Sequence, residues 1–209
     1  MGLRQATGAA LTAACLLGGA ATASATSTAS SGAASSGANQ ASATAMQSSV
    51  NSADADFVMM MIPHHFQALV LSGLVEDGGS DAEVRALAER IDVEQHGEIL
   101  MMQGWQGSNG LEVTNAEEAY QEMLQDPEMV EAMGMATPAE LEDLSSAHGT
   151  AADMLFLQLM IKHHQGAINM LLDVITNGSD PQMQEWALDM LSVQTVQVDM
   201  MQQMQDRLS

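Results

Sequence analysis

The chain has 209 residues, of which 46% are hydrophobic and only 3% aromatic, and 27 acidic against 5 basic residues give it a net charge of −22. An acidic excess of this size excludes a nucleic-acid partner, because phosphate binding needs a basic surface. It is typical of a solvated surface adapted to high salt, and a diffuse attraction for cations is the alternative.

Residues 1–25 carry the pattern of a secretory signal peptide. Arg4 precedes an apolar stretch rich in Ala and Leu, and small residues end it at Ala23-Ser24-Ala25. This predicts export to the periplasm or the medium. Cys15 is the only cysteine, so no intramolecular disulfide can form. A lipid anchor on Cys15 is the alternative to cleavage near Thr26.

The segment 26–52 is built almost entirely of Ala, Ser, Thr and Gly. Such a composition buries too little apolar surface to offset its conformational entropy, so a disordered linker is expected. No later apolar run reaches the ~18 residues of a membrane span. The mature chain is therefore expected to have no transmembrane helix.

Apolar residues then recur every three or four positions, and this periodicity predicts an all-α fold. Four long helices are expected, over residues 54–76, 81–106, 153–176 and 181–207. Ser80 with Glu83 resembles a capping box, and Asp180-Pro181 is typical of an N-cap followed by proline. Gly or Asn beyond each first helix predicts its C-cap.

The two halves of this region repeat each other at an offset of 99 residues. Phe57–Ala68 reads FVMMMIPHHFQA and Phe156–Ala167 reads FLQLMIKHHQGA. The domain 53–209 is therefore divided into repeat 1 (54–106), a connector (107–152) and repeat 2 (153–206). Short turns make each repeat an antiparallel hairpin, and the connector begins short helices at Asn115 and Thr137. The prediction is a four-helix bundle with a partly helical crossover.

Each repeat holds a His-His pair preceded by a methionine. A helix turns about 100° per residue, so one histidine of each pair is expected inside and its neighbour at the flank. On the second helices, Gln95, Glu98 and Met102 share a face, as do their counterparts in repeat 2, and these polar groups should pair with each other or with a ligand.

A methionine at helical spacing is more often core filler than a ligand, but the conjunction with His-His at matched positions favours a metal site. Thioether and imidazole together suit Cu(I), and imidazole also suits Cu(II) and Zn(II). The candidate ligands are Met61, His64, His65, Met102, Met160, His163, His164 and Met201. Sites that depend on imidazole should release metal near the usual histidine pKa of about 6.5.

The pattern F-x-x-x-M-I-x-H-H-x-G-A-I-x-M at 156–170, with Q-x-x-E-I-x-x-M at 95–102 and Met133-Gly134-Met135 between, resembles the bacterial DUF305 family (domain of unknown function 305). The resemblance covers residues 54–205. It implies a ferritin-like helical bundle, export and, as in some Met- and His-rich members, copper handling. Phe66-Gln67 and Gln197 depart from the family pattern.

Three functions remain open from the sequence. The first is an exported copper- or silver-binding protein that sequesters or passes on metal. The second is a structural or interaction bundle without metal. The third is a ferritin-like di-metal oxidoreductase, which is disfavoured because no Glu-x-x-His occurs. No nucleophile lies in a recognisable setting, so no enzyme is predicted, and copper is the expected ligand.

Overall fold

The computed structural model describes residues 50–209, and this part of the chain is helical without a strand. The predicted signal peptide, Cys15 and the linker up to residue 49 lie outside the described residues. The helices are α2 (Ser52–Gly78), α3 (Ala82–Ser108), α4 (Ala116–Met123), α5 (Pro127–Ala132), α6 (Pro138–Ser146), α7 (Thr150–Asn177) and α8 (Pro181–Leu208). The four long helices begin and end within three residues of the predicted bounds.

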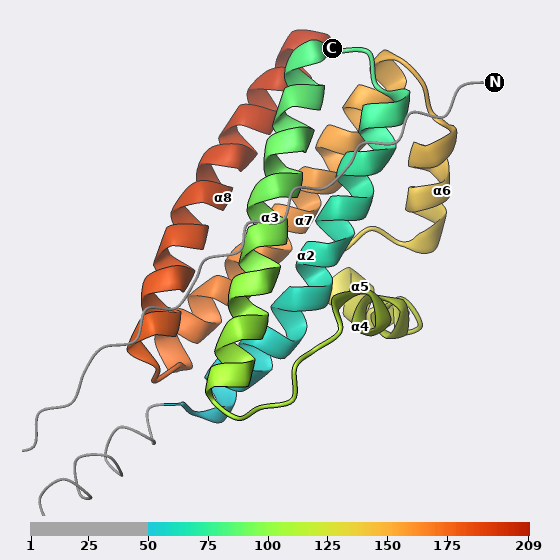
Figure 1. Cartoon of the computed structure of the whole chain (residues 1–209). Helices are drawn as coiled ribbons and strands as arrows, with labels where there is room; N and C mark the ends of the chain where they lie inside the picture. The colour runs from blue at the N-terminus through green and yellow to red at the C-terminus, as the bar shows by residue number, and fades with distance from the viewer. Residues whose placement is uncertain (1–49) are drawn as a thin grey trace, which may run out of the picture. The chain divides into compact units, whose positions relative to one another are not determined.

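The four long helices are α2, α3, α7 and α8, and they run side by side (Figure 1). The backbones pack most closely between α2 and α3, between α7 and α8, and between α2 and α7. The short helices of the connector follow the α2–α7 side, where α4 lies against α2 and α6 contacts both α2 and α7. The first helices of the two repeats are thus neighbours, covered by the connector.

Helix starts follow local side-chain chemistry. Asn51 caps α2 in a capping box with Asp54, so this helix begins inside the predicted linker segment. The predicted capping box of Ser80 with Glu83 is wrong, because the N-cap of α3 is Asp81, whose carboxylate accepts from the amides of Glu83 and Val84. Asp180 caps α8 as predicted, with Pro181 in the first turn.

Each hairpin turn is held by hydrogen bonds to an aspartate of the other repeat. Asp54 of α2 accepts hydrogen bonds from the amides of Ser179 and Asp180 at 3.1 Å. At the other end, Asp153 of α7 accepts from the amide of Ser80 at 3.0 Å and from that of Asp81 at 3.0 Å. Each first helix therefore closes the turn of the other repeat, which fixes the two hairpins to one another.

The glycines at these turns leave room for the two aspartate side chains. Gly79 and Gly178 end their helices as predicted, but with negative φ of −72° and −68° rather than in the left-handed C-cap conformation. A Cβ on Gly79 would lie 2.5 Å from Oδ1 of Asp153, and one on Gly178 would lie 2.5 Å from Oδ1 of Asp54. Glycine is needed here because the carboxylate approaches the backbone closely.

Two apolar clusters fill opposite ends of the four long helices. The first apolar cluster includes Ala68, Leu71, Val75, Val84, Leu87, Ile91, Ala136, Leu144, Phe156, Leu157, Leu159, Met160 and Met201. The second apolar cluster includes Phe57, Val58, Met61, Ile62, Ile99, Met102, Trp105, Ala167, Leu171, Val174, Met183, Ala187 and Met190. Most members of one cluster are the repeat counterparts of members of the other. All four histidines of the pairs lie between the clusters.

Among the described helices, α2 alone is long and apolar enough to cross a membrane. Most of that window is buried against other helices, and it contains the two histidines and Gln67. Its composition is that of a central helix with neighbours on several sides.

Candidate metal centre

The histidine pairs are buried more completely than the sequence predicts. His64, His65, His163 and His164 are all fully buried, so the expectation of one flank-facing histidine in each pair is wrong. The reason is the connector, which lies over the side of α2 and α7 that would otherwise meet water. The remaining described histidines, His96 and His148, are exposed.

His64 and His163 occupy equivalent positions and face each other across the α2–α7 interface. Their ring centroids are 3.7 Å apart with the planes tilted by 31°. Nε2 of His163 lies 2.8 Å from the carbonyl oxygen of His64, and Nε2 of His64 lies 3.1 Å from the carbonyl oxygen of Met133 in the connector. A hydrogen-bond chain thus runs from α7 through α2 to the connector.

His65 and His164 face the second helix of their own repeat instead. Nε2 of His65 lies 2.7 Å from a carboxylate oxygen of Glu98. Nε2 of His164 lies 2.8 Å from the side-chain oxygen of Gln197, whose amide nitrogen donates to Glu94 at 2.6 Å. The ring of His65 therefore contacts a carboxylate directly, whereas the ring of His164 is linked to a carboxylate through the side-chain amide of Gln197.

These contacts assign the neutral tautomer of the rings. Carbonyl and carboxylate oxygens only accept, and Gln197 presents its oxygen because its nitrogen is committed to Glu94. Each Nε2 therefore carries the hydrogen and each Nδ1 the lone pair. Within residues 50–209, none of the four Nδ1 atoms has a hydrogen-bond partner at normal geometry. At looser geometry the backbone of Met160, one turn before His164, also acts on that ring as a hydrogen-bond partner and raises its pKa.

Burial lowers the pKa of three of these rings and favours their uncharged form. Desolvation, with a smaller effect of neighbouring His65, lowers the pKa of His64 to about 3. Desolvation also lowers the pKa of His164 to about 4, against the opposing hydrogen bond to Gln197, and lowers the pKa of His163 well below its usual value. Neutral imidazole is the form that binds metal, so ligand capacity persists far below pH 6.5.

The predicted methionine ligands lie in the apolar clusters on either side of the histidines. Met61 and Met102 are fully buried together in the second cluster, and Met160 and Met201 in the first. Met61 is one helical turn before His65, and Met160 is one turn before His164. No three side chains of the His, Cys, Asp or Glu type in the described part converge as a ready-made metal set.

Two glutamines extend this polar layer, which comprises His64, His65, Glu94, Gln95, Glu98, His163, His164, Gln194 and Gln197. Gln95 and Gln194 occupy equivalent positions and are 3% and 2% exposed. The sequence predicts that they pair with each other or with a ligand, and both ends of both amides lack a partner among the described residues. Leaving such a group unpaired costs about 1–3 kcal/mol, so water or a bound ion is expected beside them.

Sequence reasoning missed two members of this site. Glu94 lies one turn before Glu98 on the same face of α3, so helical spacing alone could have identified it. Met133 contributes a backbone carbonyl, which no side-chain pattern reveals; only its place in Met133-Gly134-Met135 drew attention to it.

Comparison with known proteins agrees with this architecture. The chain matches the model of a domain of unknown function, DUF305, over residues 54–205. It is similar to a DUF305 protein from Streptomyces coelicolor described as secreted, at 30% identity over 75% of this chain and 94% of that one, with a TM-score of 0.65. A DUF305 fragment from Deinococcus radiodurans is 29% identical over 76% of this chain and 98% of its own, with a TM-score of 0.67.

The solved structures also include a copper-bound protein. CopM in the Cu(II)-bound form is 28% identical over 75% of this chain and 97% of its own, with a TM-score of 0.64. CopM in Cu(I)-bound and Ag-bound forms matches as well, at 26% and 27% identity. A search of curated proteins returned no match.

Proposed function

This chain belongs to the DUF305 family, and we propose that it is an exported protein that binds Cu(I) or Ag(I) and sequesters or passes on the metal outside the cytoplasm. The four long helices form a ferritin-like four-helix bundle around the polar layer. One ion is bound in each repeat, by Met61, His65 and Met102 in repeat 1 and by Met160, His164 and Met201 in repeat 2. His64 and His163 complete the layer between them.

One observation carries the proposal: among the described residues, each of the four buried imidazoles donates through Nε2 to an oxygen, and no Nδ1 has a hydrogen-bond partner at normal geometry. Metal-binding histidines characteristically donate their other ring nitrogen to a carboxylate or carbonyl, which orients the ring and raises its basicity. The contacts of His65 with Glu98 and of His164 with Gln197 have this form. A buried lone pair without a donor is otherwise a cost to the fold.

The methionine positions support a soft monovalent ion. Thioether sulfur carries no proton and prefers Cu(I) or Ag(I) to hard cations, and imidazole is compatible with both. The match to CopM, which has been solved with Cu(I), Cu(II) and Ag, supports the same class of ligand. The surrounding apolar clusters would shield bound Cu(I) from water.

Affinity for Cu(I) measured by competition with a chromophoric chelator under anaerobic conditions tests the proposal. Met61→Leu with Met160→Leu removes one sulfur from each site while keeping the apolar volume, and we expect Cu(I) binding at least about tenfold weaker. Met183→Leu with Met190→Leu removes two buried methionines of the second cluster away from the histidines and should leave affinity unchanged.

Replacing His64, His65, His163 and His164 together by Ala should abolish this binding. Because that variant empties the polar layer, its helical content must be checked by circular dichroism before its affinity is interpreted. Wild-type affinity in the folded methionine pair variant would show that the buried sites do not bind the metal.

A structural role without metal is the second candidate. It is favoured by the contacts that already satisfy every Nε2, and above all by the chain from His163 through His64 to Met133. A buried polar layer of this kind can fix the register of packed helices. In that case the wild-type protein would bind neither Cu(I) nor Ag(I) tightly, and the histidine variants would only lose stability.

The carboxylates of the layer do not assemble as a di-iron site would require. Glu94 and Glu98 lie on one helix and are engaged by Gln197 and His65, respectively. A carboxylate-bridged di-metal oxidoreductase needs inward glutamates from several helices. The observed contacts therefore favour binding over redox catalysis.

A further inference from the structure

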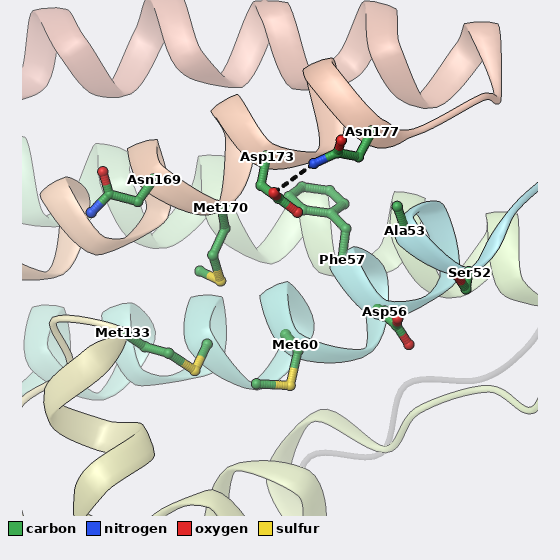
Figure 2. Close-up of a pocket in the computed structure, with 10 residues that line it drawn as sticks. All are labelled: Ser52, Ala53, Asp56, Phe57, Met60, Met133, Asn169, Met170, Asp173 and Asn177. Carbon is green, nitrogen blue, oxygen red and sulfur yellow. Dashed lines mark hydrogen bonds between the residues drawn. The ribbon is translucent and has the colours of Figure 1, made fainter.

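A pocket of about 540 Å³ opens on the side of the protein where the first half of α2, the last half of α7 and the connector meet. Three methionines from these three elements line it: Met60, Met133 and Met170. Figure 2 shows their thioether groups pointing into the same space, with Phe57, Asp56 and Asp173 further along the pocket. Met60 and Met170 are half-buried, so their side chains are partly accessible to solvent.

The repeat supplies an internal comparison for this pocket. The counterparts of Met60 and Met170 in the other repeat are Leu159 and Leu71, which are 2% and 0% exposed in the first apolar cluster. There the connector fills the α2–α7 groove with Ala136 and Leu144. The equivalent groove at the other end is left open and carries sulfur in place of branched carbon.

The chemistry of the pocket points to a soft cation. Packing alone is satisfied by leucine at the equivalent positions, whereas methionine adds a polarizable sulfur ligand. Met123, Met129 and Met135 belong to the same connector cluster as the three pocket methionines. The exposed carboxylates of Asp56 and Asp173 at the pocket make its entrance attractive to a cation.

Met133 joins the pocket to the buried histidines. Its side chain lines the pocket while its carbonyl oxygen lies 3.1 Å from Nε2 of His64. The histidines themselves are fully buried, so an ion from solvent cannot meet them first. We propose that Met60, Met133 and Met170 form a separate, sulfur-only site that captures Cu(I) or Ag(I) at the surface. It rests on the soft-metal function proposed above but not on the histidine sites.

Ag(I) titration of the exported protein, labelled with ¹³C at the methionine methyl groups, tests this site. Met60→Leu with Met170→Leu installs the residues of the other repeat, so the fold should be retained. We expect this variant to bind one Ag(I) fewer than wild type. In wild type, the methyl signals of Met60, Met133 and Met170 should shift together with that ion. The matched control, Met183→Leu with Met190→Leu, should keep the full number of bound ions.

The same titration separates this proposal from the histidine sites. If the surface site exists, the fourfold histidine variant retains one Ag(I) and the shifts of the three pocket methyl groups. Loss of that ion only in the histidine variant, with the Met60/Met170 variant unchanged, overturns the surface site and leaves the histidine sites standing. Absence of tight Ag(I) binding in wild type overturns both.

Discussion

Where the connector crosses the two repeats, repeat 1 carries Phe66 and Gln67 and repeat 2 carries Gln165 and Gly166. Phe66 packs on Tyr120 with ring centroids 5.4 Å apart, and Gln67 holds both backbone groups of Ala136, accepting from its amide at 2.6 Å and donating to its carbonyl at 2.9 Å. Gly166 instead gives room to the connector: a Cβ there would lie 1.8 Å from the carbonyl oxygen of Met133.

This difference accounts for the divergence of the two repeats at Phe66-Gln67 and Gln165-Gly166. A single connector cannot meet two equivalent helices in the same way, so the repeats diverge where they touch it. Repeat 1 supplies side chains that hold the connector, and repeat 2 supplies a gap that admits it. The histidines of the polar layer and the turn aspartates remain alike in the two repeats.

The second difference lies in the polar layer, where Glu98 of repeat 1 corresponds to Gln197 of repeat 2. Glu98 meets His65 directly, whereas Gln197 relays His164 to Glu94, a residue of repeat 1. Both carboxylates therefore come from α3. The layer holds two acidic groups without placing charge on both second helices.

The largest expected effect is the pH dependence of stability, which tests the buried histidines that the two repeats share. The pKa values of His64 and His164 are about 3 and 4 in the folded protein, and that of His163 is also lowered, against about 6.5 when unfolded. The unfolded chain therefore takes up protons first as pH falls. Stability of the metal-free protein should be full above pH 6.5 and decline below it, by up to about 1.4 kcal/mol per pH unit for each ring.

Urea unfolding of the metal-free protein between pH 7.5 and 4 measures this decline. Replacing the exposed His96 and His148 by Gln should leave the slope unchanged. A stability that is constant from pH 7 to 5 would contradict the burial of uncharged rings.

Gly166→Ala should break the asymmetry at the connector. The added methyl group meets the backbone of Met133, which cannot move without disturbing its contact with His64, so we expect the free energy of unfolding to fall by about 3 kcal/mol. Gly73→Ala, at an exposed position of α2, is the matched control, because no atom lies within 4 Å of its added Cβ. The higher helix propensity of alanine should stabilise this variant by up to about 1 kcal/mol. Equal stabilities of the two variants would refute this packing.

Gln67→Leu removes the other half of that asymmetry. It leaves the buried amide and carbonyl of Ala136 without their partner, and we expect a loss of about 2 kcal/mol in urea unfolding. Gln165→Leu changes the same residue type at an exposed position of repeat 2 and should alter stability by less than about 0.5 kcal/mol. The idea fails if both substitutions are equally mild.

Gln197→Glu tests the relay in the polar layer. The new carboxylate would face Glu94 where an amide now donates at 2.6 Å, so the two acids must share a proton. Relative to wild type at the same pH, we expect a loss of about 1 kcal/mol at pH 8 and less at pH 5. Glu98→Gln places the residue of repeat 2 at the equivalent position of repeat 1. At pH 8 it should lower the free energy of unfolding by less than Gln197→Glu does. Identical losses at both pH values would argue against the relay.

The sequence by itself determined the all-helical class, the bounds of the four long helices and the division into two repeats. These follow from local periodicity, caps and a constant offset, all of which act within one helix or one hairpin. The motif also identified the family. The candidate ligands remain predictions. Their pairing within each repeat could be anticipated, because an antiparallel hairpin determines which residues of its two helices face each other.

Only the tertiary structure decided what covers the histidines and which groups their rings meet. The burial of both members of each pair depends on a connector that contacts Gln67 and passes close to Gly166. The carboxylate linked to His164 through Gln197 is that of Glu94, which belongs to the other repeat. Such contacts join segments far apart in the chain, and no spacing along one helix determines them, because they arise only when two hairpins and a connector pack against each other.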